Sequence, residues 1–249
     1  MNNYLGVHVS RRRDRYWFCI LGDDLSVRVL ERGSLTEVLG YAAGEDTRAA
    51  GIDAPVVVNS GLMARDEVRQ RFSPPPAENR FTNLRLGEYE LVRKKMKIYR
   101  TADSKGACPK WMRNGFRLYA RLAGLGYQAY LGEESGLGWL EVPSEAAFHA
   151  VIGQSLLPVE GLEGRIQRQL LLWKLGVQVP DPMEAFEEIT RYRMERGKFP
   201  FQRIHTSAEQ LAIMCAFMAW TVEKNPAHLV QVGAEEEGKL TLPVKLISD

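Results

Sequence analysis

Short apolar segments separated by turn residues open the chain. They are rich in Val, Ile and aromatic residues and cover residues 4–10, 16–21 and 25–30. Turn residues occupy positions 22–24, between the second segment and the third. Runs of this length bounded by turns are typical of hairpin strands, so the pattern predicts three antiparallel strands.

The residues that follow predict a helix and a further strand. Ser34 and, three residues later, Glu37 form a capping-box pattern, which predicts a helix through Tyr41. The apolar run AAGIDAPVVV at residues 49–58 predicts a fourth strand. Pro55 should end the regular pairing of this strand, because proline has no amide hydrogen to donate.

Helical periodicity dominates after the loop SPPPAEN at residues 73–79. The predicted helices cover residues 86–96, 111–122, 144–152, 162–175, 182–196 and 207–223. Two strands, at residues 127–131 and 139–142, interrupt this series. Residues 229–232 and 239–244 predict a final hairpin.

This order of elements predicts the fold class. Three antiparallel strands, a helix, and then a strand among alternating helices indicate an α/β protein with a mixed sheet and helices on both faces. The chain has 249 residues, of which 45% are hydrophobic, enough for a large core. We expect a single domain over residues 1–249, with residues 74–126 forming a basic helical insertion or flap.

Composition narrows the class of protein only slightly. The 33 basic and 31 acidic residues nearly cancel, so the overall charge indicates no partner. The three cysteines are scattered singly, which argues against a disulfide framework or a structural zinc site. The chain has no leader-like start and no run of eighteen apolar residues, so the sequence predicts a cytoplasmic protein without a membrane segment.

A series of segments spread over almost the whole chain resembles one protein family. In order they read GVHVS, GIDAP, RLGEYELVRKKMKIY, WMRNGFRLYARLAGLGY, LEVPSEAAF, LEGRIQRQLLLWKLGV, SAEQLAIMCAFMAW and VGAEEEGKLTLPV. Their order and spacing resemble family 429 of the domains of unknown function, which are predicted nucleases with a ribonuclease H-like fold. The resemblance implies three antiparallel strands followed by parallel strands in one sheet.

The resemblance also implies a chemistry. Ribonuclease H-like enzymes place carboxylates on the first strand, the fourth strand and a late helix, where they bind Mg²⁺ or Mn²⁺ for attack of water on a phosphodiester. This sequence has His8 at the first of these positions and Ala212 at the third. Asp53 alone keeps the expected acid.

His8 and Asp53 are predicted to face each other. Strand alternation places Gly6, His8 and Ser10 on one face of the first strand. The fourth strand, which carries Asp53, should be its parallel neighbour. His8 is then either a hydrogen-bonded structural imidazole or a metal ligand or general base, and its nitrogen would favour Mn²⁺ over Mg²⁺. Asp53 either bonds the turn before Pro55 or acts in the site.

Other carboxylates are candidates for the same cluster. Glu88 and Glu141 match acidic positions of the family, so the resemblance makes them metal ligands together with Asp53. Glu209 precedes Ala212 by one helical turn, and its side chain either reaches the end of the sheet or lies in solvent. A stripe of small residues on this helix indicates close helix packing: Ala208, Ala212, Cys215 and Ala219.

Two sets of basic residues are candidates for phosphate binding. Arg165 and Arg168 are three residues apart on one helix face, where two guanidinium groups could bind one anion, or else pair with Glu163 and other acids. Residues 80–117 hold eleven basic and three acidic residues, with aromatic residues interleaved. Arg85 in this segment is a further candidate phosphate ligand.

Basic groups with interleaved aromatic rings suit single-stranded nucleic acid. The alternative for residues 80–117 is a solvated basic face around an ordinary core. The basic run at residues 11–13 is interpreted as a solvated hairpin turn.

The sequence therefore leaves two hypotheses. The first is a metal-dependent nuclease or phosphodiesterase, weakened because acids are missing at positions 8 and 212, with Asp53, Glu88, Glu141, His8 and Glu209 in the site. The second is a protein of the same fold that binds a nucleic acid or nucleotide without catalysis, or acts as an adaptor between proteins.

Overall fold

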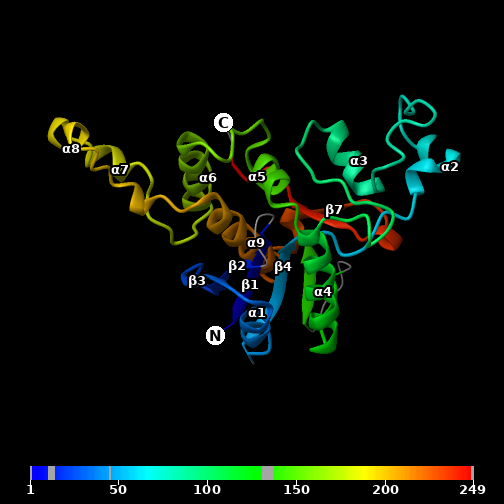
Figure 1. The fold of residues 1–249 in the computed structure, drawn as a ribbon, viewed down its shortest axis with the longest axis horizontal. Helices are drawn as coiled ribbons and strands as arrows, with labels where there is room; N and C mark the ends of the chain where they lie inside the picture. Colours follow the sequence, from blue (N-terminus) through cyan, green and yellow to red (C-terminus); the bar gives the residue numbers. More distant parts are fainter. Residues whose placement is uncertain (1, 11–14, 45, 131–136, 248–249) are drawn as a thin grey trace.

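A mixed β-sheet runs through the molecule, and helices cover both of its faces (Figure 1). The computed structural model describes residues 2–10, 15–44, 46–130 and 137–247. Over these residues the sheet has eight strands in the order β3-β2-β1-β4-β6-β8-β7, with β5 paired to β6. The strands are β1 (Asn3–Val9), β2 (Tyr16–Gly22), β3 (Val27–Gly33), β4 (Thr47–Asp53), β5 (Gln128–Ala129), β6 (Gly138–Glu141), β7 (Leu229–Val232) and β8 (Leu240–Pro243).

The helices alternate with the later strands, as the sequence predicts. The α-helices are α1 (Leu35–Ala42), α2 (Asp66–Arg69), α3 (Leu86–Arg93), α4 (Lys110–Gly124), α5 (Ser144–Ile152), α6 (Leu162–Lys174), α7 (Glu184–Glu187), α8 (Arg191–Glu195) and α9 (Ser207–Lys224). Short 3-10 turns lie at Leu62–Ala64, Phe201–Arg203, Pro226–His228 and Glu235–Glu237. The predicted α/β class is confirmed.

The first strands pair as the hairpin pattern predicts. β1 is antiparallel to β2 and parallel to β4, and β2 is antiparallel to β3. The predicted bounds of the third strand were wrong, because Leu25 has a φ of 61° and belongs to the turn. The strand begins at Val27 instead and continues to Gly33. The capping box of Ser34 and Glu37 is confirmed at the start of α1.

The fourth strand is shorter than predicted. β4 ends at Asp53, and the chain leaves the sheet before Pro55. Beyond this point the amide of Val56 donates to the Glu141 side chain, 2.9 Å away, in place of a strand neighbour. Asp53 is therefore the last residue of a parallel strand, at the edge where the carboxyl ends of β1 and β4 meet.

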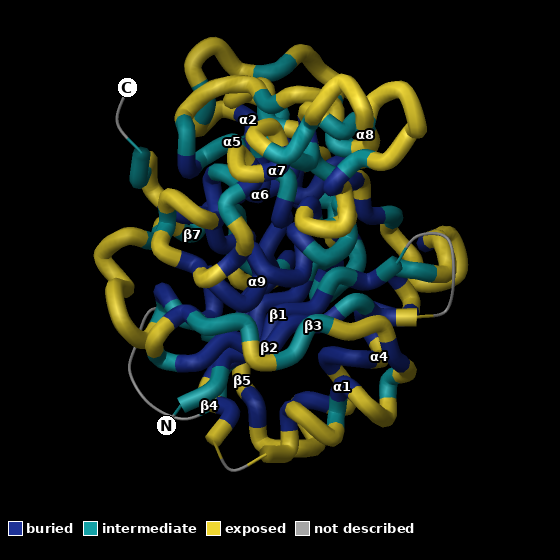
Figure 2. The backbone as a smooth tube through the Cα atoms, turned by 90° about the vertical axis from the view of Figure 1, so that its left-hand side faces the viewer, coloured by how far each residue is buried: buried dark blue, intermediate teal, exposed yellow. Residues whose placement is uncertain are grey.

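Helix α9 covers one face of the sheet at very short range. A side chain at Gly6 would overlap the Ala212 carbonyl, and one at Gly51 would overlap the Cys215 carbonyl. Ala212 and Cys215 are fully buried in this contact. The stripe of small residues therefore serves helix packing, and the core lies between α9 and the strands, shown dark in Figure 2.

Helices α1 and α4 cover the opposite face. Leu118, Tyr119 and Leu122 of α4 share a core cluster with Leu5 and Val7 of β1. Helix α4, which falls within the predicted insertion or flap at residues 74–126, is thus one of the layers of the fold. The local reason is the amphipathic pattern of α4, which buries one apolar stripe against the strands.

The helix predicted at residues 182–196 is broken into α7 and α8. Thr190 has extended backbone angles, and its side chain accepts from the Arg193 amide, which starts α8 as a separate helix. These two helices project from the rest of the molecule, at the far left of Figure 1. Every residue of α8 is exposed or half-buried, and the Tyr192 side chain is 60% exposed.

The remaining predictions had different outcomes. The strand predicted at residues 127–131 shrinks to β5, and its last residue, Leu131, lies outside the described residues. The basic run at residues 11–13 also lies outside them. The predicted final hairpin is confirmed as the antiparallel pair β7 and β8. Within the described part of the chain, the helices are all too short or too polar to cross a membrane.

Candidate functional site

His8 and Asp53 form a hydrogen-bonded pair at the carboxyl ends of β1 and β4. The two residues are register partners in the parallel ladder, and His8 Nδ1 lies 2.7 Å from Asp53 Oδ2. Since a carboxylate only accepts hydrogen bonds, the proton of this bond belongs to Nδ1. In the neutral imidazole Nε2 is then a proton acceptor. The predicted juxtaposition is confirmed, and it is an imidazole–carboxylate pair.

Ser144 fixes the other side of the Asp53 carboxylate. Its hydroxyl donates to Asp53 Oδ2 at 2.7 Å, and its amide donates to Oδ1 at 3.4 Å. Ser144 is the first residue of α5, so the carboxylate lies at a helix N-terminus, where the helix dipole favours a negative charge. The chain of contacts from Ser144 through Asp53 to His8 holds the imidazole in one orientation and one tautomer.

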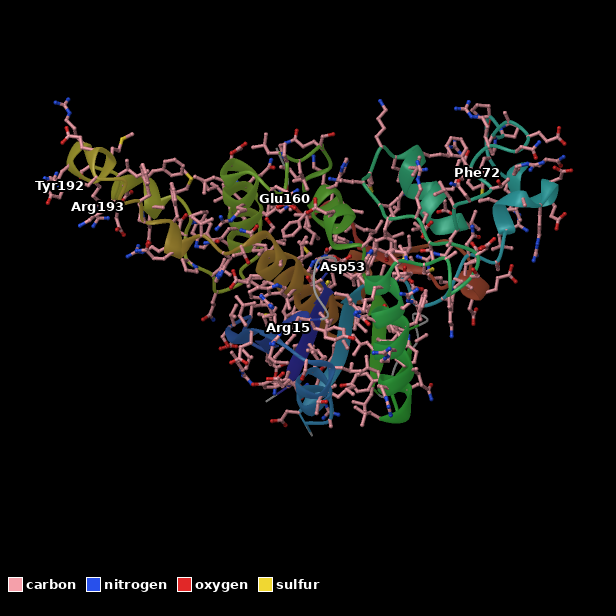
Figure 3. All side chains as sticks on the ribbon, in the orientation of Figure 1. Arg15, Asp53, Phe72, Glu160, Tyr192 and Arg193 are labelled. Carbon is pink, nitrogen blue, oxygen red and sulfur yellow. The ribbon has the colours of Figure 1, made fainter. Side chains whose placement is uncertain are left out.

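A cavity of about 660 Å³ opens beside this pair. Its walls come from β1, β2, the end of β4, the segment at residues 97–99 after α3, the start of α5, α6 with the loop before it, and the first turns of α9. The His8 and Asp53 side chains are 13% and 12% exposed, so both reach the cavity without lying in open solvent. Figure 3 labels Asp53 near the centre of the molecule and Glu160, another lining residue, above it.

The charges of the cavity wall are partly neutralised. The Glu145 carboxylate binds Arg168, with Nη2 and Oε2 2.7 Å apart. Glu160 is exposed at the rim. Two cations, Lys97 and Arg165, also line the cavity. The Arg165 guanidinium is held at the wall by bonds to the carbonyls of residues 204 and 205, at 2.5 and 2.9 Å.

A second group of carboxylates surrounds Arg85 beneath the cavity. Arg85 Nε donates to Glu88 at 3.0 Å, while Nη1 and Nη2 bind both oxygens of Glu141. The Tyr99 hydroxyl donates to Glu141 at 2.8 Å, and the Thr101 hydroxyl donates to Glu88 at 2.5 Å. The side chains of Arg85, Glu88 and Glu141 are 2% exposed or less. This arrangement is a buried ion-pair network.

Burial and the neighbouring charges together set the pKa values in this network. Burial raises the pKa of Glu88, and the Arg85 guanidinium only partly opposes that shift. The pKa of Arg85 is raised well above its usual value by the neighbouring Glu141 and Glu88 carboxylates, against the effect of burial. Burial next to Glu141 likewise raises the pKa of the Tyr99 hydroxyl far above its usual range. Tyr99 is therefore a neutral donor on the cavity wall.

The metal site implied by the resemblance does not fit these contacts. Glu88 and Glu141 are bound by an arginine, whose positive charge repels a cation, and Asp53 already accepts from His8 and Ser144. Among the described residues, no three side chains of His, Cys, Asp or Glu are grouped closely enough to hold a metal ion. The prediction that Asp53, Glu88 and Glu141 share one metal cluster was therefore wrong.

The late helix adds no acid to the cavity. Ala212 packs against Gly6 of β1 and does not line the cavity. From this part of α9 the cavity is lined by Ala208 and Leu211 instead. The Glu209 side chain closes the capping box of α9, where it accepts from the Thr206 amide at 2.6 Å. Its role is to begin the helix, so of the two alternatives for Glu209 the one in which it reaches the end of the sheet does not hold.

The three predicted phosphate ligands have different surroundings. Arg85 is buried between carboxylates, and Arg168 is buried against Glu145 and two backbone carbonyls. Neither guanidinium reaches a ligand in the cavity. Arg165 alone lines it. Two arginines three residues apart on one helix thus point to different partners, because one side of α6 faces α5 and the other faces the residues before α9.

Ser144, Lys97 and Trp17 are site residues that the sequence analysis missed. Ser144 follows a proline at the start of a predicted helix, a position that typically contacts an anion. Trp17 is the register partner of His8 on β2, so strand pairing places it at the cavity. Lys97 carried no signal that separated it from the other basic residues around it.

Three comparisons complete this description. Neither the protein-family models, nor the curated proteins, nor the solved structures gave a match to the chain. The resemblance to family 429 therefore stays a prediction.

Proposed function

We propose that this protein binds single-stranded nucleic acid, with a phosphodiester of the strand seated in the cavity beside His8 and Asp53. The observation that carries the proposal is a cavity lined by two cations and two aromatic rings: Lys97, Arg165, Trp17 and Tyr99. The proposal takes only the nucleic-acid binding from the second of the two hypotheses drawn from the sequence. The carboxylates that a metal-dependent nuclease needs are bound by Arg85, His8 and Ser144.

The cavity suits a nucleotide unit in size and chemistry. Its volume of about 660 Å³ lies within the range of small-molecule and cofactor sites, roughly 300–1,000 Å³. Lys97 and Arg165 supply positive charge for a phosphate. Trp17 and Tyr99 supply ring surfaces on which a base can stack.

The exposed side of α4 carries a second group of cations. Arg113, Arg117 and Arg121 follow one another at spacings of four residues on its exposed side. The sequence of α4 contains no acidic residue. Residues this far apart on a helix form one stripe, and such a stripe can contact successive phosphates of a strand.

Aromatic rings on the cavity wall contact the first turn of α4. The rings of Tyr99, on the cavity wall, and Trp111, in the first turn of α4, meet edge to face with centroids 5.5 Å apart. Tyr99 also shares a buried cluster with Met112 and Phe116 of the same helix. The segment that carries Lys97 and Tyr99 is therefore fixed on the N-terminal half of α4.

Binding of a fluorescein-labelled oligothymidylate, followed by fluorescence anisotropy at several salt concentrations, tests the proposal. Replacing Arg113, Arg117 and Arg121 by Gln should weaken binding at least tenfold and flatten its salt dependence, because each lost phosphate contact removes about one unit from the slope. The matched control replaces three exposed cations in and just after α8 by Gln: Arg191, Arg196 and Lys198. Equal losses in the two triple variants, or no binding by the unaltered protein, would reject the proposal.

A further inference from the structure

We infer that the cavity hydrolyses a phosphodiester without a bound metal ion, with His8 as the general base. The inference rests on the proposed function, since it requires the phosphate to lie in the cavity. It adds a reaction to that binding and assigns the reacting group. The site belongs to a metal-independent class of phosphodiester hydrolase, in contrast to the metal-dependent chemistry that the sequence resemblance implies.

The His8 imidazole has a fixed orientation. A general base must present an unprotonated nitrogen in a fixed direction, and the 2.7 Å bond from Nδ1 to Asp53 leaves Nε2 as that nitrogen. Asp53 is itself held by the Ser144 hydroxyl at 2.7 Å. A carboxylate behind an imidazole both fixes its tautomer and stabilises the imidazolium that forms when Nε2 takes a proton.

The place of His8 in the molecule also supports this role. An imidazole that served only to hold two strands together would be enclosed by them. His8 instead stands at the carboxyl ends of β1 and β4 and lines the cavity with Asp53. Lys97 and Arg165 line the same cavity, so a phosphate bound there faces both cations and the imidazole.

Protons and electrons balance in the reaction. His8 Nε2 takes one proton from a water molecule, whose oxygen forms a bond to phosphorus while the bond from phosphorus to the leaving ester oxygen breaks. That oxygen departs with the bonding electron pair and takes a proton from solvent. The second proton of the water stays on the phosphate product, and the imidazolium returns its proton to solvent. Lys97 and Arg165 stabilise the negative charge that develops on the phosphoryl oxygens.

The test uses bis(p-nitrophenyl) phosphate, whose hydrolysis releases a coloured phenolate, with the full chain in excess EDTA. We expect hydrolysis that EDTA does not reduce. His8→Ala should lower the rate at least 100-fold, a typical contribution of general-base catalysis. Added imidazole should restore part of this loss, because it can occupy the vacated space and act as the base. The matched control is His228→Ala, which removes an exposed imidazole near β7 and should leave the rate unchanged.

Asp53→Asn supplies a second variant in case His8→Ala fails to fold. It keeps the size of the side chain and should also lose at least 100-fold, without rescue by imidazole, because His8 still fills its place. Hydrolysis that requires Mn²⁺ and disappears in EDTA would overturn the inference in favour of a metal enzyme. Oligothymidylate binding without any hydrolysis would overturn it while leaving the proposed function intact. Absence of both binding and hydrolysis would reject the two together.

Discussion

Two carboxylate centres lie on adjacent strands of one sheet and have opposite characters. Asp53 ends β4 and Glu141 ends β6, and the residue before Asp53 is the register partner of Glu141. Asp53 is bound by an imidazole and a serine at the edge of a cavity. Glu141 is bound by an arginine and a tyrosine in a site almost closed to solvent.

The difference shows that the partner of a carboxylate decides its role. Arg85 brings a full positive charge and several donors, so it balances the buried Glu88 and Glu141 and fixes α3 against the sheet. His8 brings one donor and keeps one acceptor, so the pair it forms with Asp53 can exchange a proton with a ligand. One centre stabilises the fold, and the other faces the cavity.

Replacing Arg85 should produce the largest effect. Arg85→Met leaves Glu88 and Glu141 buried without a counter-charge, and we expect it to lower the free energy of unfolding by about 3–5 kcal/mol. Urea unfolding followed by circular dichroism measures this loss. Arg191→Met, at the exposed start of α8, is the control and should change stability by less than about 0.5 kcal/mol. Similar losses in both variants would show that the network does not stabilise the fold.

Matched amide substitutions should separate the two centres. Glu141→Gln weakens the bonds from Arg85 and Tyr99 and should cost about 2–3 kcal/mol of stability. Asp53→Asn changes a partly exposed group and should cost about 1 kcal/mol or less. Unfolding and hydrolysis measured on the same preparations should rank the two variants in opposite order. If Asp53→Asn were the less stable variant, the assignment of roles would be reversed.

The contact between His8 and Asp53 could be predicted because it depends on regular strand geometry. Alternation places every second side chain of β1 on one face, and parallel pairing brings position 8 level with position 53. The capping box at Ser34 could be predicted for the same reason, since it depends on residues three apart along one helix turn.

The network of Arg85 could not be predicted, because its partners are distant along the chain. Arg85 and Glu141 are separated by 56 residues, and their contact depends on how α3 packs near the end of β6. In the sequence, Arg85 is one of many basic residues between positions 80 and 117. Nothing local separates the one that is buried from those that are exposed, so basic composition alone suggested a phosphate ligand.

The pH dependence of stability tests the surroundings of Glu88 in the buried centre. Burial raises the pKa of Glu88 above its usual value of 4.5. The folded chain therefore holds this proton more tightly than the unfolded chain does, and stabilisation by Glu88 is fully present below pH 4.5 and is lost as the pH rises through the raised value. Glu88→Gln cannot ionise, so its stability should fall less steeply over this range.

Urea unfolding of the two proteins at a series of pH values above 4.5 measures this difference. Glu67→Gln is the control, since Glu67 is exposed on α2. This control should follow the unaltered protein at every pH. Identical pH profiles for all three proteins would show that Glu88 titrates alike in the folded and unfolded chains.

The smallest effect is expected from the serine behind Asp53. Ser144→Ala removes the 2.7 Å bond to the carboxylate and should cost about 0.5–1.5 kcal/mol of stability. Because Ser144 acts on His8 only through Asp53, the substitution should lower kcat for hydrolysis about tenfold and leave KM unchanged. Ser207→Ala is the matched control, since its hydroxyl also belongs to the cavity wall but donates to the Val159 carbonyl instead. If Ser144→Ala loses kcat and Ser207→Ala does not, the orientation of His8 matters for the reaction. Equal changes in the two variants would mean that Ser144 contributes only to packing. In that case only His8 and Asp53 themselves would distinguish the reactive centre from the structural one.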